Sequence, residues 1–360
     1  MDNSGRINYE NSGVSINTAN DTKSQFKDIV SSKTLSHCKP LNRVGAFASL
    51  VEINLKDYEN PVFVLKSEEP GSKQMISIDN NRFEWIARDL INHLINDIIV
   101  MGAVPCAVLD TIICGKFEKE TVLKLVGGIS KACEENGCVL VGGETSEQPG
   151  MLPGGRYVLQ ASVLGIAEKS KIIDGTGIEC GNTLIALPSN GLHTNGYSLV
   201  RKLMEIKPEI INEKINGENF LDAILKPHLS YFKAAGAAIQ KYRADIRAMA
   251  HITGGGIHDN LERVINGENL QAVIDLSSVK VLPVFNVIKK YANTSDDEML
   301  AAFNNGVGMI AAVSGSKTNE VIDALKAEGV GAYPIGQIEK SAGGGSGGKK
   351  VVFKNKLRWQ

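Results

Sequence analysis

Apolar residues in the first half of the chain switch repeatedly between helical spacing and short β-like runs, and this alternation limits the possible folds most strongly. Helical spacing is present in 82–100 and again in 118–136. Short, wholly apolar runs follow each of them, at 107–113 and 138–141. Runs of this length between amphipathic segments predict buried strands between helices. The pattern indicates an α/β or α+β fold.

The second half repeats the alternation after a polar stretch, 169–182, that contains three glycines. Strands are predicted at 183–187, 271–276, 308–313 and 333–338, and helices at 196–206, 231–241, 284–291 and 319–328. The polar stretch predicts a boundary, which gives two domains, 1–172 and 173–360. Residues 343–348 (GGGSGG) have the composition of a flexible linker, and either a long hairpin loop or an engineered insert would explain them.

Composition excludes several classes of function. Lys and Arg number 39 against 40 Asp and Glu, so the chain lacks the basic excess expected of a nucleic-acid-binding protein. No run of 18 apolar residues is present, which argues against a membrane-spanning helix. The start, MDNSGRINYENSG, does not resemble a secretory signal, and the six cysteines form no Cys-x-x-Cys pair. We therefore expect a cytoplasmic protein with reduced, mostly buried thiols.

Two glycine-containing loops precede predicted helices. Residues 190–198 (NGLHTNGYS) place Thr194 or Asn195 as a predicted N-cap, and 251–256 (HITGGG) lead into the next helix. Helix N-termini present unpaired N–H groups, and glycines allow the backbone to approach an anion. Neither loop matches GxGxxG or GxxxxGK[ST], so neither a Rossmann site nor a P-loop is indicated. Each loop is either an ordinary turn or a phosphate site.

Acidic residues gather in the first half. Asp89, His93 and Asp97 lie four residues apart on one face of the predicted helix, either as a solvated stripe or as a functional group. Glu68 and Glu144 each follow a predicted strand, where ligand sites of α/β proteins commonly lie. Carboxylates at strand ends suit Mg²⁺, which prefers oxygen ligands.

Several motifs resemble one enzyme family. They are 96–97 (ND) with 102–105 (GAVP), 142–151 (GGETSEQPGM), 191–201 (GLHTNGYSLVR), 251–256 (HITGGG) and 303–309 (FNNGVGM). In this order they are similar to phosphoribosylformylglycinamidine cyclo-ligase, also called aminoimidazole ribonucleotide (AIR) synthetase. The resemblance implies an N-terminal ATP-binding domain, a C-terminal α/β domain and a homodimer formed through the N-terminal sheets. It also implies an active site in the cleft, where ATP drives closure of the imidazole ring of AIR from formylglycinamidine ribonucleotide.

The resemblance also implies roles for individual residues. Glu68, Asp97 and Glu144 are the candidates for binding Mg²⁺ and the ATP triphosphate, and Lys73 is the candidate counter-charge. His193 and His251 are candidates for proton transfer, or for a positioning hydrogen bond. The candidates for holding the phosphate of the ribonucleotide substrate are Thr194, Asn195, Gly196, Thr253, Gly254, Gly255 and Gly256.

One loop departs from the family pattern. The family has Thr-Asp-Gly-Val-Gly-Thr-Lys where residues 67–73 read SEEPGSK, and Glu69 replaces a glycine there. An added negative charge beside triphosphate predicts weaker ATP binding. Three functions therefore stay open: the cyclo-ligase itself, a paralogue that uses ATP to activate an amide-like oxygen of another substrate, and an ATP-deficient relative without catalysis.

Overall fold

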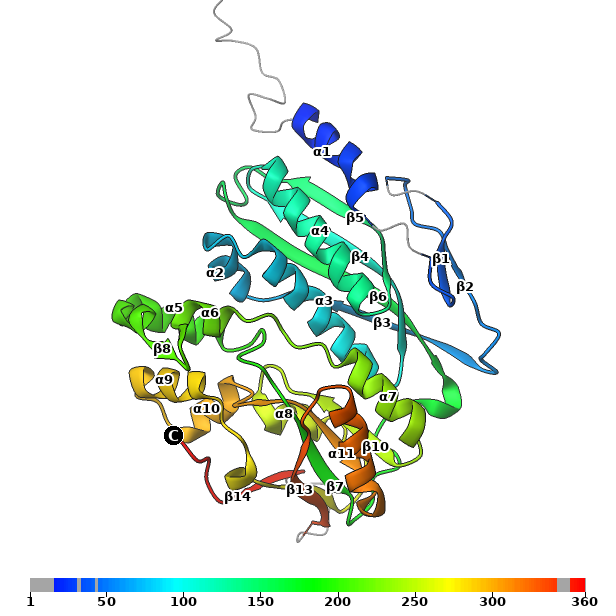
Figure 1. The fold of residues 1–360 in the computed structure, drawn as a ribbon, viewed down its shortest axis with the longest axis vertical. Coiled ribbons are helices and arrows are strands. Elements are labelled where there is room, and N and C mark those ends of the chain that lie inside the picture. The colour runs from blue at the N-terminus through cyan, green and yellow to red at the C-terminus, as the bar shows by residue number, and fades with distance from the viewer. Residues whose placement is uncertain (1–15, 31–33, 43–44, 342–349, 360) are drawn as a thin grey trace, which may run out of the picture. The chain divides into compact units, whose positions relative to one another are not determined.

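The computed structural model describes residues 16–30, 34–42, 45–341 and 350–359 (Figure 1). The chain forms two compact units. The first contains the residues up to Leu94 together with Pro105–Ile166, and the second contains Ile95–Val104 and everything from Ala167 onward. These units differ from the predicted domains 1–172 and 173–360 mainly because the end of one helix, with the turn after it, belongs to the second unit.

The first unit is built on a four-stranded sheet with the strand order β3-β6-β4-β5. A separate antiparallel pair is formed by β1 and β2. The elements are α1 (Ile16–Ile29), β1 (Cys38–Pro40), β2 (Val51–Ile53), β3 (Pro61–Glu68), α2 (Lys73–Asp79), α3 (Phe83–Ile99), β4 (Val104–Cys114), α4 (Lys119–Glu135), β5 (Val139–Glu147) and β6 (Tyr157–Glu168). Figure 1 shows α2, α3 and α4 on one face of this sheet.

The second unit has a six-stranded sheet with the order β10-β12-β7-β13-β11-β14. Its strands are β7 (Thr183–Pro188), β10 (Ile246–His251), β11 (Leu270–Asp275), β12 (Val307–Val313), β13 (Tyr333–Lys340) and β14 (Val351–Lys354), with a small pair β8 (Lys214–Ile215) and β9 (Glu218–Asn219). The helices are α5 (Tyr197–Ile206), α6 (Phe220–Leu225), α7 (Phe232–Tyr242), α8 (Gly256–Glu262), α9 (Pro283–Ala292), α10 (Asp296–Ala302) and α11 (Thr318–Ala327).

The mixed α/β architecture predicted from the alternation is confirmed in both units. Residues 343–348 lie outside the described residues. The strands on either side of them, β13 and β14, are not neighbours, since both pair with β11 and β14 does so in parallel. The prediction of a hairpin loop is therefore wrong.

The cysteines follow the expectation of mostly buried thiols. Five of the six thiols are buried, and Cys180 is exposed. Burial raises the pKa of Cys38 to about 11 and that of Cys106 to about 12, so these thiols stay protonated and unreactive at neutral pH. Within the described ranges, no helix has the length and apolar character needed to cross a membrane.

Helix α3 is buried on its polar face as well as its apolar one. Ile86, Leu90 and Leu94 have no exposed surface, as the helical spacing predicts. Asp89 is also fully buried and His93 is 6% exposed, so the alternative of a solvated stripe is wrong. Buried charged groups need partners because desolvation is costly.

Lys73 is the partner of Asp89. The Nζ of Lys73 lies 2.7 Å from the Oδ1 of Asp89, and neither side chain has exposed surface. Burial lowers the pKa of Lys73, and the adjacent Asp89 carboxylate acts in the opposite direction. The ammonium therefore neutralises a buried carboxylate inside the first unit, and it would have to leave Asp89 to serve as the predicted counter-charge for triphosphate.

We expect Lys73→Met to destabilise the protein by about 3–5 kcal/mol, because the charge of Asp89 would stay buried without its ammonium. The double variant Lys73→Met/Asp89→Leu should recover most of this loss, since it removes both charges. Urea unfolding measures the free energies. Lys202→Met is the control, because the Lys202–Glu205 pair is 62% and 69% exposed and should contribute less than about 1 kcal/mol. Equal stability of the Lys73 and Lys202 variants would contradict the expectation.

Candidate functional site

Three histidines and an aspartate gather inside the second unit. His193 follows β7, His228 lies between α6 and α7, His251 ends β10, and Asp97 lies near the end of α3. The histidines are 0%, 1% and 6% exposed. The sequence predicted roles for Asp97, His193 and His251 but gave no signal for His228, which no spacing or motif connected to the others.

The side chains of the cluster form a continuous chain of contacts. The Oδ1 of Asp97 lies 2.7 Å from the Nδ1 of His251. The Nε2 of His251 lies 2.9 Å from the Nε2 of His228. The His193 ring stacks on the His228 ring, with centroids 3.9 Å apart and planes at 21°. Four polar groups with titratable chemistry are therefore in direct contact, and such clusters are typical of functional sites.

The loop that carries His193 is held in an unusual backbone conformation. His193 has a φ of +62°, in the left-handed region that non-glycine residues rarely occupy. Asn304 holds this loop in place. Its Nδ2 donates to the carbonyl oxygens of Gly191 and Leu192, and its Oδ1 accepts from the hydroxyl of Ser189. The 303–309 motif thus supports the 191–201 motif structurally.

Gly308 provides the space beneath the cluster. A Cβ at this position would lie 1.9 Å from the Oη of Tyr231 and 2.7 Å from the Cε1 of His193. Tyr231 is fully buried and donates its hydroxyl to the carbonyl oxygen of Pro188, and burial raises its pKa. Only glycine allows the strand β12 to approach these two rings so closely.

Asn96 fixes the segment that carries His228. Its Nδ2 donates to the carbonyl oxygen of Leu229, at 2.9 Å, and its Oδ1 accepts from the backbone N–H of Tyr231, at 3.0 Å. Asp97 is the next residue and contacts His251. One turn of α3 therefore holds both His251 and the segment that follows His228. This gives a physical reason for the Asn-Asp sequence of the 96–97 motif.

The two glycine loops meet each other. The Oδ1 of Asn195 lies 3.4 Å from the position that a Cβ on Gly254 would take. Asn260 fixes the second loop by donating to the carbonyl oxygens of Gly254 and Gly256 and by accepting from the hydroxyl of Thr253. The Nδ2 of Asn195 is buried and makes no hydrogen bond among the described residues. A buried donor of this kind costs about 1–3 kcal/mol, which indicates an acceptor supplied from outside.

The predicted N-caps are wrong by one or two residues. Gly196, with a φ of +78°, caps α5 in place of Thr194 or Asn195. A Cβ at Gly196 would lie 2.1 Å from the Phe303 ring, so packing as well as the left-handed backbone demands glycine. Gly255, with a φ of +87°, caps α8 in the same way.

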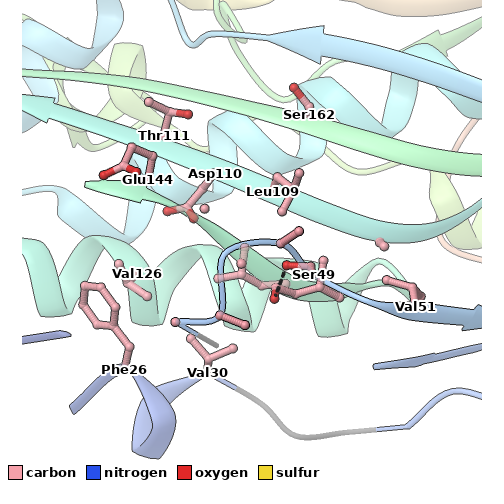
Figure 2. A pocket seen from close by; sticks show the side chains of 18 of the residues that line it. Phe26, Val30, Ser49, Val51, Leu109, Asp110, Thr111, Val126, Glu144 and Ser162 are labelled. Atoms are coloured by element: carbon pink, nitrogen blue, oxygen red, sulfur yellow. Dashed lines mark hydrogen bonds between the residues drawn. The ribbon is translucent and has the colours of Figure 1, made fainter. Parts of the chain in front are cut away.

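The first unit holds a cavity of about 790 Å³ (Figure 2). On one side lie Asp110, Thr111 and Glu144, and β4–β5 pairing places Thr111 opposite Glu144. Figure 2 shows Phe26, Val30 and Val126 on another side. The remaining lining comes largely from residues 45–51, 140–145 and 162–164.

The double glycine of the 142–151 motif leaves space that two neighbouring side chains occupy. A Cβ on Gly143 would lie 1.9 Å from the Oδ1 of Asp110, and a Cβ on Gly142 would lie 2.4 Å from the hydroxyl of Ser49. The Ser49 hydroxyl donates to the carbonyl oxygen of Val141. Burial raises the pKa of Asp110 to about 7, so this carboxyl is protonated in much of the protein near neutral pH.

The predicted carboxylates Glu68 and Glu144 do not meet within one chain. They lie on β3 and β5, the two outer strands of the sheet, with β6 and β4 between them. Three strand spacings separate these strands by about 14 Å. The carboxylate of Glu68 lies 3.0 Å from the Nζ of Lys66 and 3.7 Å from the Nε2 of His93. Asp97 belongs to the second unit. The joint binding of Mg²⁺ by Glu68, Asp97 and Glu144 therefore stays a prediction.

Comparisons with known proteins agree with the motifs. Residues 60–167 match the model of the AIR synthase related protein N-terminal domain, and residues 179–349 match the model of its C-terminal domain. The phosphoribosylformylglycinamidine cyclo-ligase of Aromatoleum aromaticum is 36% identical over 94% of this chain and 96% of its own. That of Neisseria meningitidis serogroup C is 37% identical with the same coverage.

The chain belongs to the phosphoribosylformylglycinamidine cyclo-ligase family. The resemblance inferred from the motifs is thereby confirmed. Among solved structures, the hydrogenase maturation protein HypE in complex with ATP shares the fold, with a TM-score of 0.63 and 15% identity over 89% of this chain and 88% of that one.

We expect the raised pKa of Asp110 to make the protein less stable as pH rises from about 4 to about 7. In this range the folded state keeps the proton of Asp110 and the unfolded state releases it, so folding becomes less favourable with increasing pH. A shift from 3.8 to about 7 corresponds to roughly 4 kcal/mol at most. Asp110→Asn should remove this part of the pH dependence.

Urea unfolding of the wild type and Asp110→Asn at several pH values measures the effect. The difference in unfolding free energy should grow in favour of the variant until about pH 7 and then level off. Asp323→Asn, at an exposed position, is the control and should run parallel to the wild type. A constant difference between Asp110→Asn and the wild type would refute the assignment.

Proposed function

We propose that this protein uses ATP to close the imidazole ring of AIR from formylglycinamidine ribonucleotide, with release of ADP and phosphate. The observation that carries the proposal is the match to enzymes named for this reaction, which runs through both units. A cytoplasmic location is part of the proposal, since ATP and a phosphorylated ribonucleotide are the reactants.

The reaction needs activation of an amide oxygen, which is a poor leaving group at neutral pH. Transfer of the terminal phosphoryl group of ATP to that oxygen gives an iminophosphate. The substrate's nearby nitrogen then attacks the same carbon, so a C–N bond forms, the C–O bond breaks and phosphate leaves. The attacking nitrogen loses a proton to a base. The protein must position the reactants, neutralise phosphate charge and accept this proton.

The cavity of the first unit is our candidate for ATP. Its volume of about 790 Å³ lies in the usual range for ligand pockets. Apolar side chains on one side suit a purine ring, and the oxygen donors Thr111 and Glu144 on the other suit a hydrated Mg²⁺ beside phosphates. The ATP complex of HypE, a protein of the same fold, supports nucleotide binding by this architecture.

The loops of the second unit are our candidate for the phosphate of the ribonucleotide. The buried Nδ2 of Asn195 supplies a donor beside Gly254, and the left-handed glycines 255 and 256 let the backbone approach an oxyanion. The cluster of Asp97 and His251 belongs to the same unit. His251 is our candidate for the base that accepts the proton of the attacking nitrogen.

The charge of the divergent loop is partly compensated. Lys66 neutralises Glu68, and the backbone N–H of Glu69 donates to the Oε1 of Glu68 at 3.1 Å. Glu69 itself is exposed. The charge that this loop adds relative to the family is that of Glu69, and solvent and salt screen an exposed charge, which favours the cyclo-ligase over the ATP-deficient relative.

Measurement of ADP release with and without formylglycinamidine ribonucleotide tests the function. We expect release that depends on this substrate and on Mg²⁺, with formation of AIR. Asn195→Ala should raise the KM for the ribonucleotide by roughly ten-fold, the equivalent of about 1.4 kcal/mol, because a charge-assisted hydrogen bond to phosphate is lost. ADP release only with other amide substrates would favour the paralogue, and absence of ATP binding would favour the non-catalytic relative.

We also propose that the protein forms a homodimer through the sheet of its first unit. Helices cover one face of this sheet, whereas Phe63 is 56% exposed, and Leu65 and Leu109, which also line the cavity, are 76% and 46% exposed. In the described part of the sheet, β3 and β5 each have one neighbour only. An apolar face with open edges is typical of an interface between copies.

Phe63→Asp should convert the dimer to monomers, because the charge would be buried in the interface. Light scattering after size-exclusion chromatography measures the mass. Ile206→Asp is the matched control, since Ile206 is 60% exposed on the second unit and should leave the mass unchanged. A wild-type protein with the mass of one chain would disprove the dimer.

A further inference from the structure

The segment after β14 folds back onto the helices α9 and α10. Asn355 ends the strand with a φ of +59°, in the left-handed region, and its Nδ2 donates to the Oδ1 of Asp275 at 2.9 Å. Leu357, two residues later, is buried. In Figure 1 the red chain runs from β14 to the neighbourhood of α9 and α10. The segment is therefore already held to the second unit where it reaches Trp359.

Trp359 joins this segment to the start of α10. Its Nε1 donates to the Oδ1 of Asp296 at 2.9 Å. The Nζ of Lys289, on α9, lies 2.9 Å from the same oxygen and 5.0 Å from the centroid of the Trp359 ring. The indole thus contacts both charges of the ion pair, the carboxylate with its N–H and the ammonium with its ring face. Three segments of the second unit meet at this one side chain.

Helix α10 connects the Trp359 contact to the glycine loops. It has seven residues and begins with a capping box between Ser295 and Glu298. Because a helix rises about 1.5 Å per residue, α10 is about 10 Å long and behaves as one rigid piece. A shift of Asp296 at its start is therefore passed on to Phe303, just after its end.

The far end of α10 packs against both glycine loops without spare room. A Cβ on Gly256 would lie 1.8 Å from the carbonyl oxygen of Leu300, and a Cβ on Gly196 would lie 2.1 Å from the Phe303 ring. Asn304 also donates to two carbonyl oxygens of the first loop. Since close-packed interiors transmit displacement, a movement of α10 must move both loops.

We propose that Trp359 is a positioning residue for the anion site of the two glycine loops. By holding Asp296 it fixes α10, and through Leu300 and Phe303 it keeps Gly256 and Gly196 in place. The inference rests on the proposed function only for the identity of the anion, which is there the phosphate of the ribonucleotide. Trp359 acts through α10 and does not contact the substrate.

Hydrogen–deuterium exchange followed by mass spectrometry tests the connection without the reaction. In Trp359→Leu we expect the amides of 296–305 and of both loops, 191–196 and 251–256, to exchange at least about three-fold faster than in the wild type, because local opening becomes easier. Peptides of the first unit should not change. Faster exchange in 355–359 with unchanged loops would overturn the proposal, since the contact would then only fasten its own segment.

Kinetics distinguish positioning from a general loss of stability. Trp359→Leu should raise the KM for the ribonucleotide about five-fold, the size typical of a packing change that acts on a site from a distance. It should leave kcat and the KM for ATP unchanged, because the loops bind a part of the substrate remote from the reacting atoms. A lower kcat with an unchanged KM for the ribonucleotide would indicate a smaller folded fraction and would overturn the positioning role.

Trp359→Phe provides the conservative variant, and it also serves if the Leu variant does not fold. The Phe ring can still face Lys289 but has no N–H for Asp296, so the KM should lie between those of the wild type and Trp359→Leu. In a double-mutant cycle with Asp296→Ala, the combined rise in KM should be smaller than the product of the two single effects. A combined effect equal to that product would contradict the connection through Asp296.

Trp85→Phe is the matched control. Trp85 also has a cation over its ring, the guanidinium of Arg82 at 4.8 Å, but it belongs to the first unit. This variant should leave the exchange of both loops and the KM for the ribonucleotide unchanged. A wild type without cyclo-ligase activity, together with faster loop exchange in Trp359→Leu, would refute the proposed function and support the positioning of the loops.

Discussion

The need to provide partners for buried polar groups governs this structure, and helix α3 shows it most clearly. The helix is almost wholly buried, yet it carries Asp89, Asn96 and Asp97. Each of these side chains has a defined partner: Lys73, the 229–231 backbone and His251. An unpartnered amide or carboxylate at these positions would cost several kcal/mol, so the contacts select one arrangement of the surrounding segments.

The sequence predicted the parts of the fold that depend on local periodicity. The helix predicted at 82–100 is α3, and the one predicted at 118–136 is α4 with Gly137 after it in the left-handed conformation. The strand β10 was missed because its sequence, IRAMAH, neither alternates nor forms a long apolar run. Periodicity reports which face of an element is buried, but it does not report which distant element covers that face.

Residues of the candidate site could be predicted from the sequence only where they lie in a motif of the family. Asp97, His193 and His251 lie in motifs of the family, and the structure brings them together with His228. His228 and Asp110 escaped sequence reasoning because their significance depends on tertiary contacts. His228 matters through rings contributed by two other segments, and Asp110 through its burial in the space that Gly143 leaves beside it. The pairing of Glu68 with Lys66 is local by contrast, since residues two apart on β3 lie on the same face of the sheet.

Gly308 makes the histidine cluster recognisable in other sequences. Even the methyl group of alanine would occupy space that the Tyr231 hydroxyl and the His193 ring now fill. A chain with any larger residue at this position must therefore arrange the loop after β7 differently. Among relatives, the identity of this one residue, together with a histidine at position 228, sorts those that can assemble the same stacked imidazoles from those that cannot.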